Sequence, residues 1–294
     1  MNGDEIMIAQ RYRLGRQLGE GSFGEVFSCT DIVSNMQFAV KMEPSDARFS
    51  QLAYENRVYR LLRGQVGVPR VQFFGKEGDY MCLVMQLLGD DMETVLRSSP
   101  SKRLPVSQVA RIGVELFQRL RHMHQRGLLH RDVKPQNILL STDPAQDRCT
   151  LFICDFGLSK RFVRKSASGI MSHTRYRDDK SLTGTPRYAS VNCQLGIEQS
   201  RRDDMESALY VLIYLAKGRL PWQGLRGKDK KEKNDKILRL KQRTSVRELC
   251  EGLPDAFAQV LHHTRGLEYE EKPDYDMCER LLGQTANILP RKEN

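Results

Sequence analysis

The 294-residue sequence has few of the features that hold metals or disulfides. Its seven cysteines include no C-x-x-C pair, and its six histidines form no H-E-x-x-H motif. These absences exclude the usual structural zinc patterns and favour a reduced intracellular protein, in which each cysteine is a small buried hydrophobe. The longest apolar runs, such as 209–216, are too short to cross a bilayer.

Signals for export and lipid attachment are also missing. The start, MNGDEIMIAQ, lacks the basic and then apolar layout of a secretory signal, and it is not a Met-Gly start for myristoylation. The end, RKEN, is no prenylation box. We therefore expect a protein without a membrane anchor, in the cytoplasm, the nucleus or both. The net charge of +10 suits acidic or polyanionic partners, but it does not choose among nucleic acid, membrane and phosphorylated protein.

The first part of the chain favours strands. Short β-prone runs separated by Gly, Asp or Asn predict antiparallel hairpins, and their ranges are 11–19, 23–31 and 37–43. The next stretch, 50–64, changes to a helical period, with Leu52, Val58, Leu61 and Leu62 on one side and Gly64 as a stop. Two further strands follow within 71–89, around a Lys-Glu-Gly-Asp turn.

After Gly89 the pattern becomes mainly helical. The segment 107–127 has the apolar spacing of a long amphipathic helix, opened by Pro105 and closed by Gly127. More helical patterns and long polar loops follow. The sequence therefore predicts a small β-rich lobe, a link at 86–89 and a larger helical lobe, with a ligand cleft between the two.

A glycine-rich motif lies among the predicted strands. Gly19, Gly21 and Gly24 have the G-x-G-x-x-G spacing, and the β-prone residues 25–29 follow them. A dinucleotide-binding fingerprint needs a helix there, so the glycines are instead predicted at a hairpin tip, where backbone N–H groups can approach an oxyanion. Taken alone, the motif fits an ordinary flexible turn equally well.

A lysine ends the apolar strand that follows this hairpin. The Lys41 side chain either extends to solvent or faces a cleft and needs an anion. Because the glycine hairpin lies just upstream, contact with a phosphate is the better interpretation. Glu55, in the predicted helix, is its candidate ion-pair partner.

The stretch 127–140, GLLHRDVKPQNILL, places charged residues between apolar flanks. Asp132 can orient a hydroxyl group and accept its proton, Lys134 can neutralise a phosphoryl group, and Asn137 offers an amide oxygen to a hard cation. Their close spacing lets all three converge on one phosphorus atom. A charged surface loop is the alternative, but the flanking leucines indicate a loop held inside.

Asp155 follows an apolar strand and precedes Phe156-Gly157, so its carboxylate is a candidate ligand for magnesium. The glycine hairpin, Lys41, Glu55, H-R-D-x-K-P-x-N and D-F-G occur once each, in the order and approximate separations of a protein kinase. The Asp-x-Lys-Pro part of this set resembles serine/threonine kinases.

The A-P-E motif that usually follows in kinases is missing. In its place the stretch 182–215, LTGTPRYASVNCQLGIEQSRRDDMESALYVLIYL, is similar to the casein kinase I family. Further similarity lies in EGDYMCLVMQLLG, LPWQGL and EKPDYDMCERLL. The resemblance runs from about Tyr12 to about Leu282.

This resemblance implies an α+β, bilobal protein kinase fold. It has a small antiparallel β-rich N-lobe with one main helix and a larger, mainly helical C-lobe. The implied boundaries are an extension at 1–11, the N-lobe at 12–88, the C-lobe at 89–284 and a tail at 285–294. The implied activity is that of a constitutively active, monomeric Ser/Thr kinase that uses ATP and Mg²⁺ and prefers acidic or phosphate-primed protein substrates.

The resemblance also implies roles for individual residues. The catalytic set is Asp132, Lys134, Lys41, Glu55 and Thr185, with Thr185 bridging Asp132 and Lys134. The ATP-binding set is Leu18, Gly19, Gly21, Gly24, Val26, Ala39, Lys41, Met85, Leu88 and Leu139, with Met85 as gate and 86–88 as hinge. The metal ligands are Asn137 and Asp155. The substrate-phosphate site is Arg187, Gly224 through its backbone, and Lys233. Asp204 ties down the catalytic loop.

Several positions depart from the family pattern. Pro186 stands in place of Ala, Gln136 and Ile138 in place of Asp and Phe, and the segment 160–180 is longer than usual. These departures bear on substrate choice and leave the catalytic set intact. Three alternatives stay open: a pseudokinase scaffold, a nucleic-acid or membrane binder that uses the positive charge, and, for Lys233, one solvated lysine among many.

Overall fold

The computed structural model describes residues 5–21, 24–47, 50–143, 151–165 and 171–287. Contacts divide the chain into two compact units. The first unit is Met1–Gly89 with Leu139–Gly157, and the second unit is Asp90–Ile138 with Leu158–Asn294. The stretch Leu139–Gly157 thus belongs to the first unit although helices of the second precede it. Among the described residues, no helix is both long and apolar enough to span a membrane.

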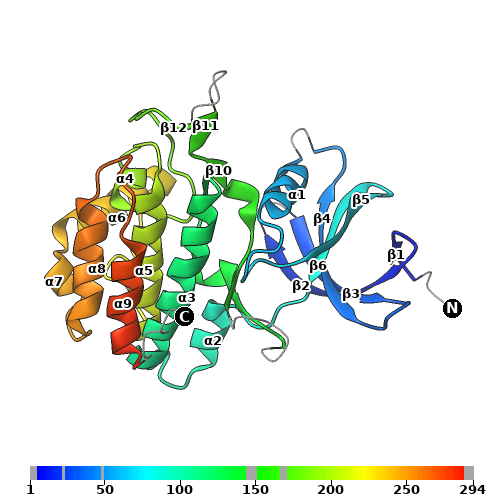
Figure 1. Cartoon of the computed structure of the whole chain (residues 1–294), viewed down its shortest axis with the longest axis horizontal. Coiled ribbons are helices and arrows are strands. Elements are labelled where there is room, and N and C mark those ends of the chain that lie inside the picture. Colours follow the sequence, from blue (N-terminus) through cyan, green and yellow to red (C-terminus); the bar gives the residue numbers. More distant parts are fainter. Residues whose placement is uncertain (1–4, 22–23, 48–49, 144–150, 166–170, 288–294) are drawn as a thin grey trace, which may run out of the picture. The chain divides into compact units, whose positions relative to one another are not determined.

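The first unit is built on a six-stranded antiparallel sheet with the strand order β1-β2-β3-β4-β6-β5 (Figure 1). Its strands are β1 (Met7–Ile8), β2 (Tyr12–Gly21), β3 (Gly24–Asp31), β4 (Gln37–Pro44), β5 (Val71–Glu77) and β6 (Tyr80–Gln86). Helix α1 (Gln51–Leu61) packs against β4, β5 and β6. Strands β8 (Ile138–Leu140) and β9 (Leu151–Ile153) form a separate two-stranded sheet.

The strands and the helix predicted for this unit are confirmed. Ser50 begins α1, because its side chain accepts a hydrogen bond from the Ala53 N–H. Leu52, Val58 and Leu62 are buried as predicted, but the prediction for Leu61 is wrong, since it is 39% exposed. Leu61 lies nine residues after Leu52, which is half a turn around the helix, so the two side chains face opposite sides.

The two faces of the sheet serve different purposes. Val40 pairs with Phe27 and Val84, and their face carries a buried apolar cluster that includes Cys29 and Cys82. Side chains alternate along a strand, so Lys41 must point to the opposite face. The register places Val26, Ala39, Lys41 and Met85 on that second face, together with Ser28 and Leu83.

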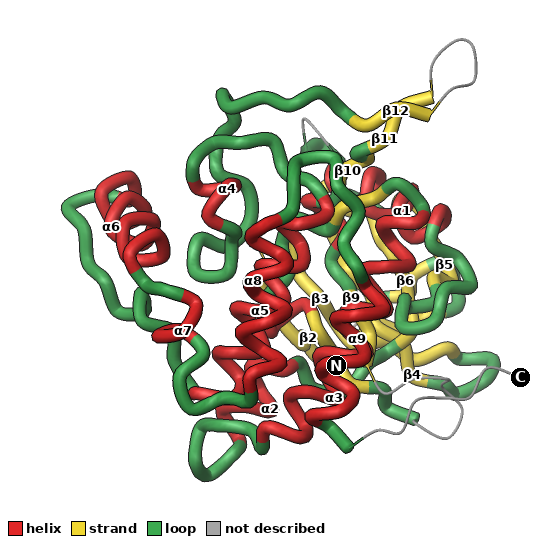
Figure 2. Tube along the Cα trace, turned by 60° about the vertical axis from the view of Figure 1, so that its left-hand side comes forward, coloured by secondary structure: helices red, strands yellow, loops and turns green. Residues whose placement is uncertain are grey.

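The second unit is mainly helical. Its helices are α2 (Met92–Ser98), α3 (Val106–Gln125), α4 (Val191–Gln194), α5 (Arg201–Lys217), α6 (Lys230–Arg243), α7 (Val246–Leu249), α8 (Asp255–Gly266) and α9 (Tyr275–Thr285). Short strands are β7 (Leu128–Leu129), β10 (Lys160–Arg161), β11 (Val163–Lys165) and β12 (Met171–His173). Helix α5 is almost wholly buried, with α3 and α8 packed against it, and α6 lies outside this bundle beside α4 (Figure 2).

Helix α3 confirms the long amphipathic helix predicted after Gly89. It begins after Pro105 and ends at Gln125, and Gly127 has the left-handed φ of +72°. Helix α2 was not predicted; Asp91 caps it by accepting hydrogen bonds from the N–H groups of Glu93 and Thr94. The unusual segment 160–180 contains β10 and the β11–β12 hairpin, and residues 166–170 lie outside the described part of the chain.

The prediction of buried cysteines holds for five of the seven positions. These are Cys29, Cys82, Cys193, Cys250 and Cys278. For Cys154 the prediction is wrong, since this residue is half-buried beside Asp155. Cys149 lies outside the described residues.

Gly24 provides a test of the hairpin geometry. It has a φ of +137°, and a Cβ added there would lie 2.1 Å from the Met42 carbonyl oxygen. We expect Gly24→Ala to lower the free energy of unfolding by about 1–3 kcal/mol, measured by urea unfolding followed by circular dichroism. Gly19→Ala is the matched control, since a Cβ there meets nothing within 4 Å. Equal stability of the two variants would contradict the clash.

Candidate active site

The first unit buries an ion pair between β4 and α1. The Lys41 Nζ lies 2.7 Å from Glu55 Oε2 and 3.0 Å from Asp155 Oδ1. The Lys41 side chain is only 11% exposed, which rules out its extension to solvent. Burial works to lower the pKa of Lys41, but the Glu55 and Asp155 carboxylates raise it on balance, so the side chain stays an ammonium ion.

The Asp155-Phe156-Gly157 motif is tied to α1 at several points. The Phe156 N–H donates to Glu55 Oε1 at 3.3 Å, and the Gln51 side chain donates to the Gly157 carbonyl at 2.8 Å. The buried Phe156 ring packs edge-on against Tyr59, with centroids 4.8 Å apart. Asp155 itself has a φ of +62°. Helix α1 therefore holds both the ion pair of Lys41 and the backbone that carries Asp155.

The predicted ATP-binding residues of the first unit lie in two places. Val26, Ala39 and Met85 share the sheet face of Lys41, and Gly19 and Gly21 pair with Val26 and Gly24 across the β2–β3 hairpin. The glycines therefore belong to a hairpin, as predicted. Other predicted residues are Leu18, which is 42% exposed, and Leu88 and Leu139, which are half-buried.

The chain at Leu88 and the chain at Leu139 run close together. The Gly89 N–H donates to the Leu140 carbonyl at 2.9 Å, and the Thr142 hydroxyl donates to the Leu87 carbonyl. The predicted hinge and strand β8 are thus joined within the first unit.

In the second unit the loop after β7 is held inside, as its apolar flanks predicted. His130 is fully buried and Asp132 is 7% exposed. The two oxygens of the Asp132 carboxylate have different partners. Oδ1 accepts from both the N–H and the hydroxyl of Thr185, each at 2.8 Å, while Oδ2 lies 2.7 Å from the Lys134 Nζ. The carboxylate thus stands between Thr185 and Lys134, whereas the predicted bridge by Thr185 placed the threonine in the middle.

The backbone around this carboxylate is equally constrained. Asn137 donates from its amide nitrogen to the Asp132 carbonyl at 2.9 Å, which turns its amide oxygen away from that carbonyl. Gly184 has a φ of +88°, and a Cβ there would lie 2.4 Å from the Arg131 carbonyl oxygen. Close approach of 183–185 to the loop therefore requires glycine at position 184.

Asp204, near the start of α5, anchors the same loop from behind. Its carboxylate accepts from the N–H groups of His130 and Arg131, each at 2.8 Å, and lies 2.9 Å from His124 Nε2. Burial works to raise the pKa of Asp204, but the hydrogen bond and charge of His124 lower it below its usual value. This confirms the predicted structural contact of Asp204 with the loop.

The three residues predicted to bind substrate phosphate each have different surroundings. Arg187 is half-buried over the rings of Tyr188 and Tyr214, and its carbonyl accepts from Trp222 Nε1 at 2.8 Å. Gly224 and Lys233 are exposed. Within the described residues, Arg187, Gly224 and Lys233 form no hydrogen bond or ion pair with one another.

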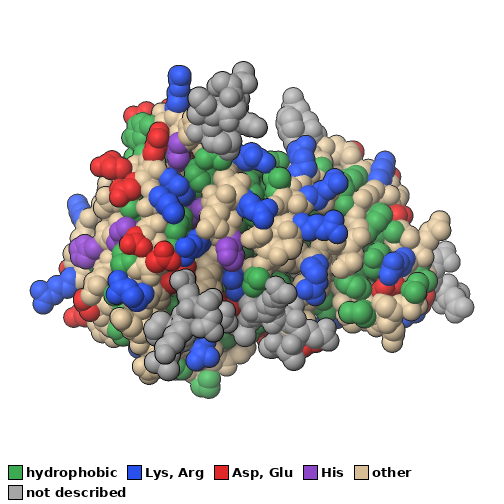
Figure 3. Space-filling model, in the orientation of Figure 1, with side chains coloured by type: hydrophobic (Ala, Val, Ile, Leu, Met, Phe, Trp, Pro, Cys, Tyr) green, Lys and Arg blue, Asp and Glu red, His purple; other side chains and the backbone are tan. Residues whose placement is uncertain are grey.

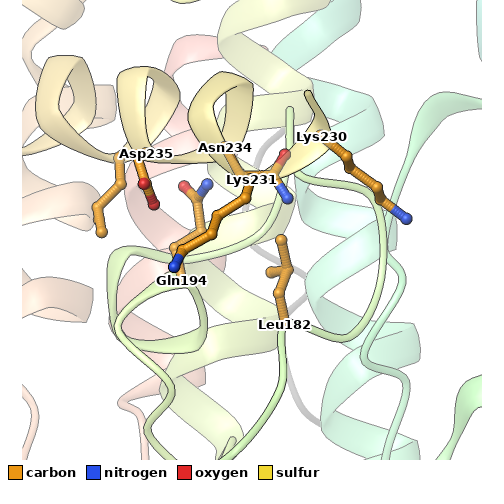
Figure 4. Close-up of a pocket in the computed structure, with 7 residues that line it drawn as sticks. Leu182, Gln194, Lys230, Lys231, Asn234 and Asp235 are labelled. Carbon is orange, nitrogen blue, oxygen red and sulfur yellow. The ribbon is translucent and has the colours of Figure 1, made fainter. Parts of the chain in front are cut away.

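A pocket of about 380 Å³ adjoins the segment that carries Thr185. It lies between α4 and α6, and Leu182 points into it from below in Figure 4. The carboxamide of Gln194 is buried there and has no hydrogen-bond partner among the described residues, and Lys231 extends in front of it (Figure 4). Lys233 does not line this pocket.

Comparison with known families agrees with this site. A family model described as "Protein kinase domain" matches residues 12–273, which is most of the chain. The chain therefore belongs to the protein kinase family. The predicted fold class is confirmed, with an antiparallel sheet in the first unit and helices in the second. A kinase domain acts on ATP with a divalent metal ion, usually Mg²⁺.

The donor set of this chain fits such a metal ion. Asn137 and Asp155 offer an amide oxygen and carboxylate oxygens, which are the hard ligands that Mg²⁺ prefers. The bond that Asn137 donates to the Asp132 carbonyl fixes the orientation of its side-chain amide. Lys41, which pairs with Val26 of the glycine hairpin, is the cation that would hold the phosphates of a bound nucleotide.

Several residues of this site carried no readable signal in the sequence. Gln51 and Tyr59 hold the Asp155 motif, and His124 supports Asp204, but each belongs to an ordinary helical pattern. Their roles depend on tertiary contacts between distant segments. Only the apolar period of α1 and α3 indicated which of their faces point inward.

The Asp204 contacts predict a pH-dependent effect on stability. Asp204→Asn removes a buried charge that accepts two backbone hydrogen bonds, and we expect a loss of about 2–3 kcal/mol in the free energy of unfolding at pH 7. Because the folded protein lowers the pKa of this carboxyl, its contribution is present above about pH 4 and is lost as the pH falls further. Urea unfolding at pH 7 and at pH 3.5 should show the difference between variant and wild type narrowing in acid.

Asp276→Asn is the control for this measurement. Its carboxylate is 82% exposed and pairs with Arg121 at the surface. Its effect should be small at both pH values. A loss at Asp204 that is as small as the loss at Asp276 would contradict the anchoring role.

Proposed function

We propose that this kinase is a serine/threonine protein kinase of the casein kinase I type. It transfers the γ-phosphate of ATP, with Mg²⁺, to Ser or Thr of acidic or phosphate-primed protein substrates. Bound MgATP supplies the phosphoryl group and neutralises charge on it. The chain's own residues bind the protein substrate, orient its Ser or Thr hydroxyl group and take up the proton of that group.

The observation that carries the proposal is the Asp132 carboxylate and its partners. Thr185 and Lys134 occupy separate oxygens and fix the plane of the carboxylate within the second unit. A carboxylate oriented in this way can accept the proton of an incoming alcohol. Lys134, which is 22% exposed, places a cation next to that base, as the Asp-x-Lys-Pro pattern of serine/threonine kinases requires.

Constitutive activity is supported by how these contacts are made. The Lys41–Glu55 pair and the Thr185–Asp132 bonds join unmodified side chains directly, so they need no phosphorylated residue to form. In many kinases the equivalent ion pair forms only when the activation segment is ordered. Here the segment at 182–189 is held by hydrogen bonds of its own backbone, such as Ala189 N–H to Thr185 O at 2.9 Å.

Preference for acidic or primed substrates is supported by charge. The protein carries a net charge of +10, and Arg187 follows Thr185 by two residues. A phosphate group has nearly two negative charges, so cations and a backbone N–H suit it. We assign this role to Arg187, Gly224 and Lys233, which belong to one unit. Lys233 as a merely solvated lysine is the competing interpretation.

Two other functions fit less well. A pseudokinase scaffold would have lost a catalytic residue, and Lys41, Glu55, Asp132, Asn137 and Asp155 are all present. A nucleic-acid or membrane binder would be expected to gather its positive charge. The most basic stretch, 226–236, instead has Asp and Glu among its lysines and contains no aromatic residue. On the face shown in Figure 3, Lys and Arg side chains lie on both units, and most acidic side chains lie on the second. We place the protein in the cytoplasm or nucleus, as a monomer.

Removal of the acid–base or phosphate-holding group tests the catalytic assignment. We expect Asp132→Asn and Lys41→Arg to fold normally and to lower casein phosphorylation by at least about a hundredfold, because each removes a group that acts on the reacting phosphate or hydroxyl. Incorporation of radiolabelled phosphate measures this. The matched controls are Asp178→Asn and Lys76→Arg, which change exposed residues in the same units. Full activity of either test variant would refute the assignment.

The anion site is tested by comparing two substrates. Changing both Arg187 and Lys233 to Ala should raise KM for a phosphoprimed peptide about tenfold or more, and KM for an acidic peptide much less. Changing both Arg247 and Lys272 to Ala removes the same charge from exposed positions and serves as the control. Equal losses on both peptides would count against the site.

A further inference from the structure

Within the described part of the chain, one lysine of the second unit is buried without a carboxylate partner. Lys241, in the last turn of α6, has no exposed surface. Its Nζ donates to the carbonyls of Pro186 and Ala189, at 2.8 Å for Pro186. It also lies over the rings of Tyr210 and Trp222, 4.9 and 5.1 Å from their centroids.

The charged side chains near Lys241 have other partners. Among the described residues, no carboxylate lies within ion-pairing distance of its Nζ. The Glu206 carboxylate instead pairs with Arg265 and accepts from the Tyr210 hydroxyl. Burial lowers the pKa of Lys241 to about 7, while Glu206 and Cys193 act to raise it and Arg265 to lower it. Both the ammonium and the neutral amine carry N–H donors for the two carbonyls.

These bonds fall on one short segment of the chain. The carbonyls of Pro186 and Ala189 are held by Lys241, and the carbonyl of Arg187, between them, is held by Trp222. Burying a lysine is costly unless hydrogen bonds compensate for its lost hydration. Here the compensating hydrogen bonds go to carbonyls of a segment that begins next to Thr185. Pro186 adds a fixed φ at the same place.

The segment leads directly to the catalytic carboxylate. Thr185 contacts Asp132 through its N–H and its hydroxyl, and the Tyr188 N–H donates back to the Thr185 carbonyl at 2.9 Å. Arg187 extends from the same backbone. A shift at 186–189 would therefore move both the partner of Asp132 and the cation assigned to substrate phosphate.

We propose that Lys241 is a positioning residue that fixes the backbone of 186–189, and that this fixed backbone sets where Thr185 meets Asp132 and where Arg187 meets substrate phosphate. The substrate part of this inference rests on the proposed function. The backbone part does not, because it concerns contacts within the second unit only. Lys241 touches neither substrate nor ATP and acts through the carbonyls it holds.

The backbone part is tested by hydrogen exchange. Lys241→Met keeps an unbranched apolar side chain but removes the donors, and we expect amide exchange in peptides that cover 185–190 to become about tenfold faster, with α3 unchanged. Ile237→Ala is the matched control. It opens a cavity one turn earlier on the same helix, at a residue that is 5% exposed, and it leaves the carbonyl contacts in place. Lys241→Arg restores donors and should restore slow exchange.

The substrate part is tested by kinetics on the same variants. We expect Lys241→Met to raise KM for a phosphoprimed peptide about tenfold and to lower kcat, with KM for ATP within about threefold of wild type. The segment that moves carries Arg187 and adjoins Thr185, the partner of Asp132, whereas the Lys41–Glu55 pair of the first unit is unchanged. Ile237→Ala should lower stability without this separation. A loss that falls on kcat and both KM values together, as general destabilisation would give, overturns the proposal.

The outcomes separate the two levels of inference. If wild type transfers no phosphate to any peptide, the proposed function fails, and the exchange result still decides whether Lys241 holds 186–189. If wild type is active and Lys241→Met leaves either the exchange or the peptide KM unchanged, the positioning role is refuted. Faster exchange together with a selective rise in peptide KM supports it.

Discussion

The cost of burying charge governs both units of this kinase. Lys41 is surrounded by two carboxylates, Asp204 by two N–H groups and a histidine, and Lys241 by carbonyls and aromatic rings. Each buried charge is stable only while its partners stay in place. Each therefore fixes segments that are far apart in the sequence, and these segments are the ones that carry Asp155, Asp132 and Thr185.

Much of the fold could be predicted because the apolar residues of its strands and helices recur at regular intervals. The strands of the first unit alternate around short polar turns, and α1 and α3 have apolar residues on one face, so their positions were predicted within a few residues. Helix α2 was not, since its seven residues give too short a pattern and its start depends on a single cap at Asp91. Leu61 was misplaced for a different reason, because nine residues after Leu52 is half a turn around the helix and leads to the exposed side.

The sequence predicted those residues of the candidate site that belong to a recognisable motif. Lys41, Glu55, Asp132 and Asp155 were named from spacing and resemblance, and the structure pairs Lys41 with Glu55. The residues that support them were not predicted. Gln51, Trp222 and Lys241 act through backbone carbonyls, and a bond to a carbonyl leaves no trace in the sequence of the residue that accepts it.

The two-faced sheet of the first unit has a practical consequence for protein engineering. Lys41 points to one face, while Phe27, Val40 and Val84 fill the other. Repacking the apolar face alters thermostability through atoms that the Lys41 side chain does not touch. Variants that express better without a change in catalytic activity are therefore best sought among the residues of the apolar face.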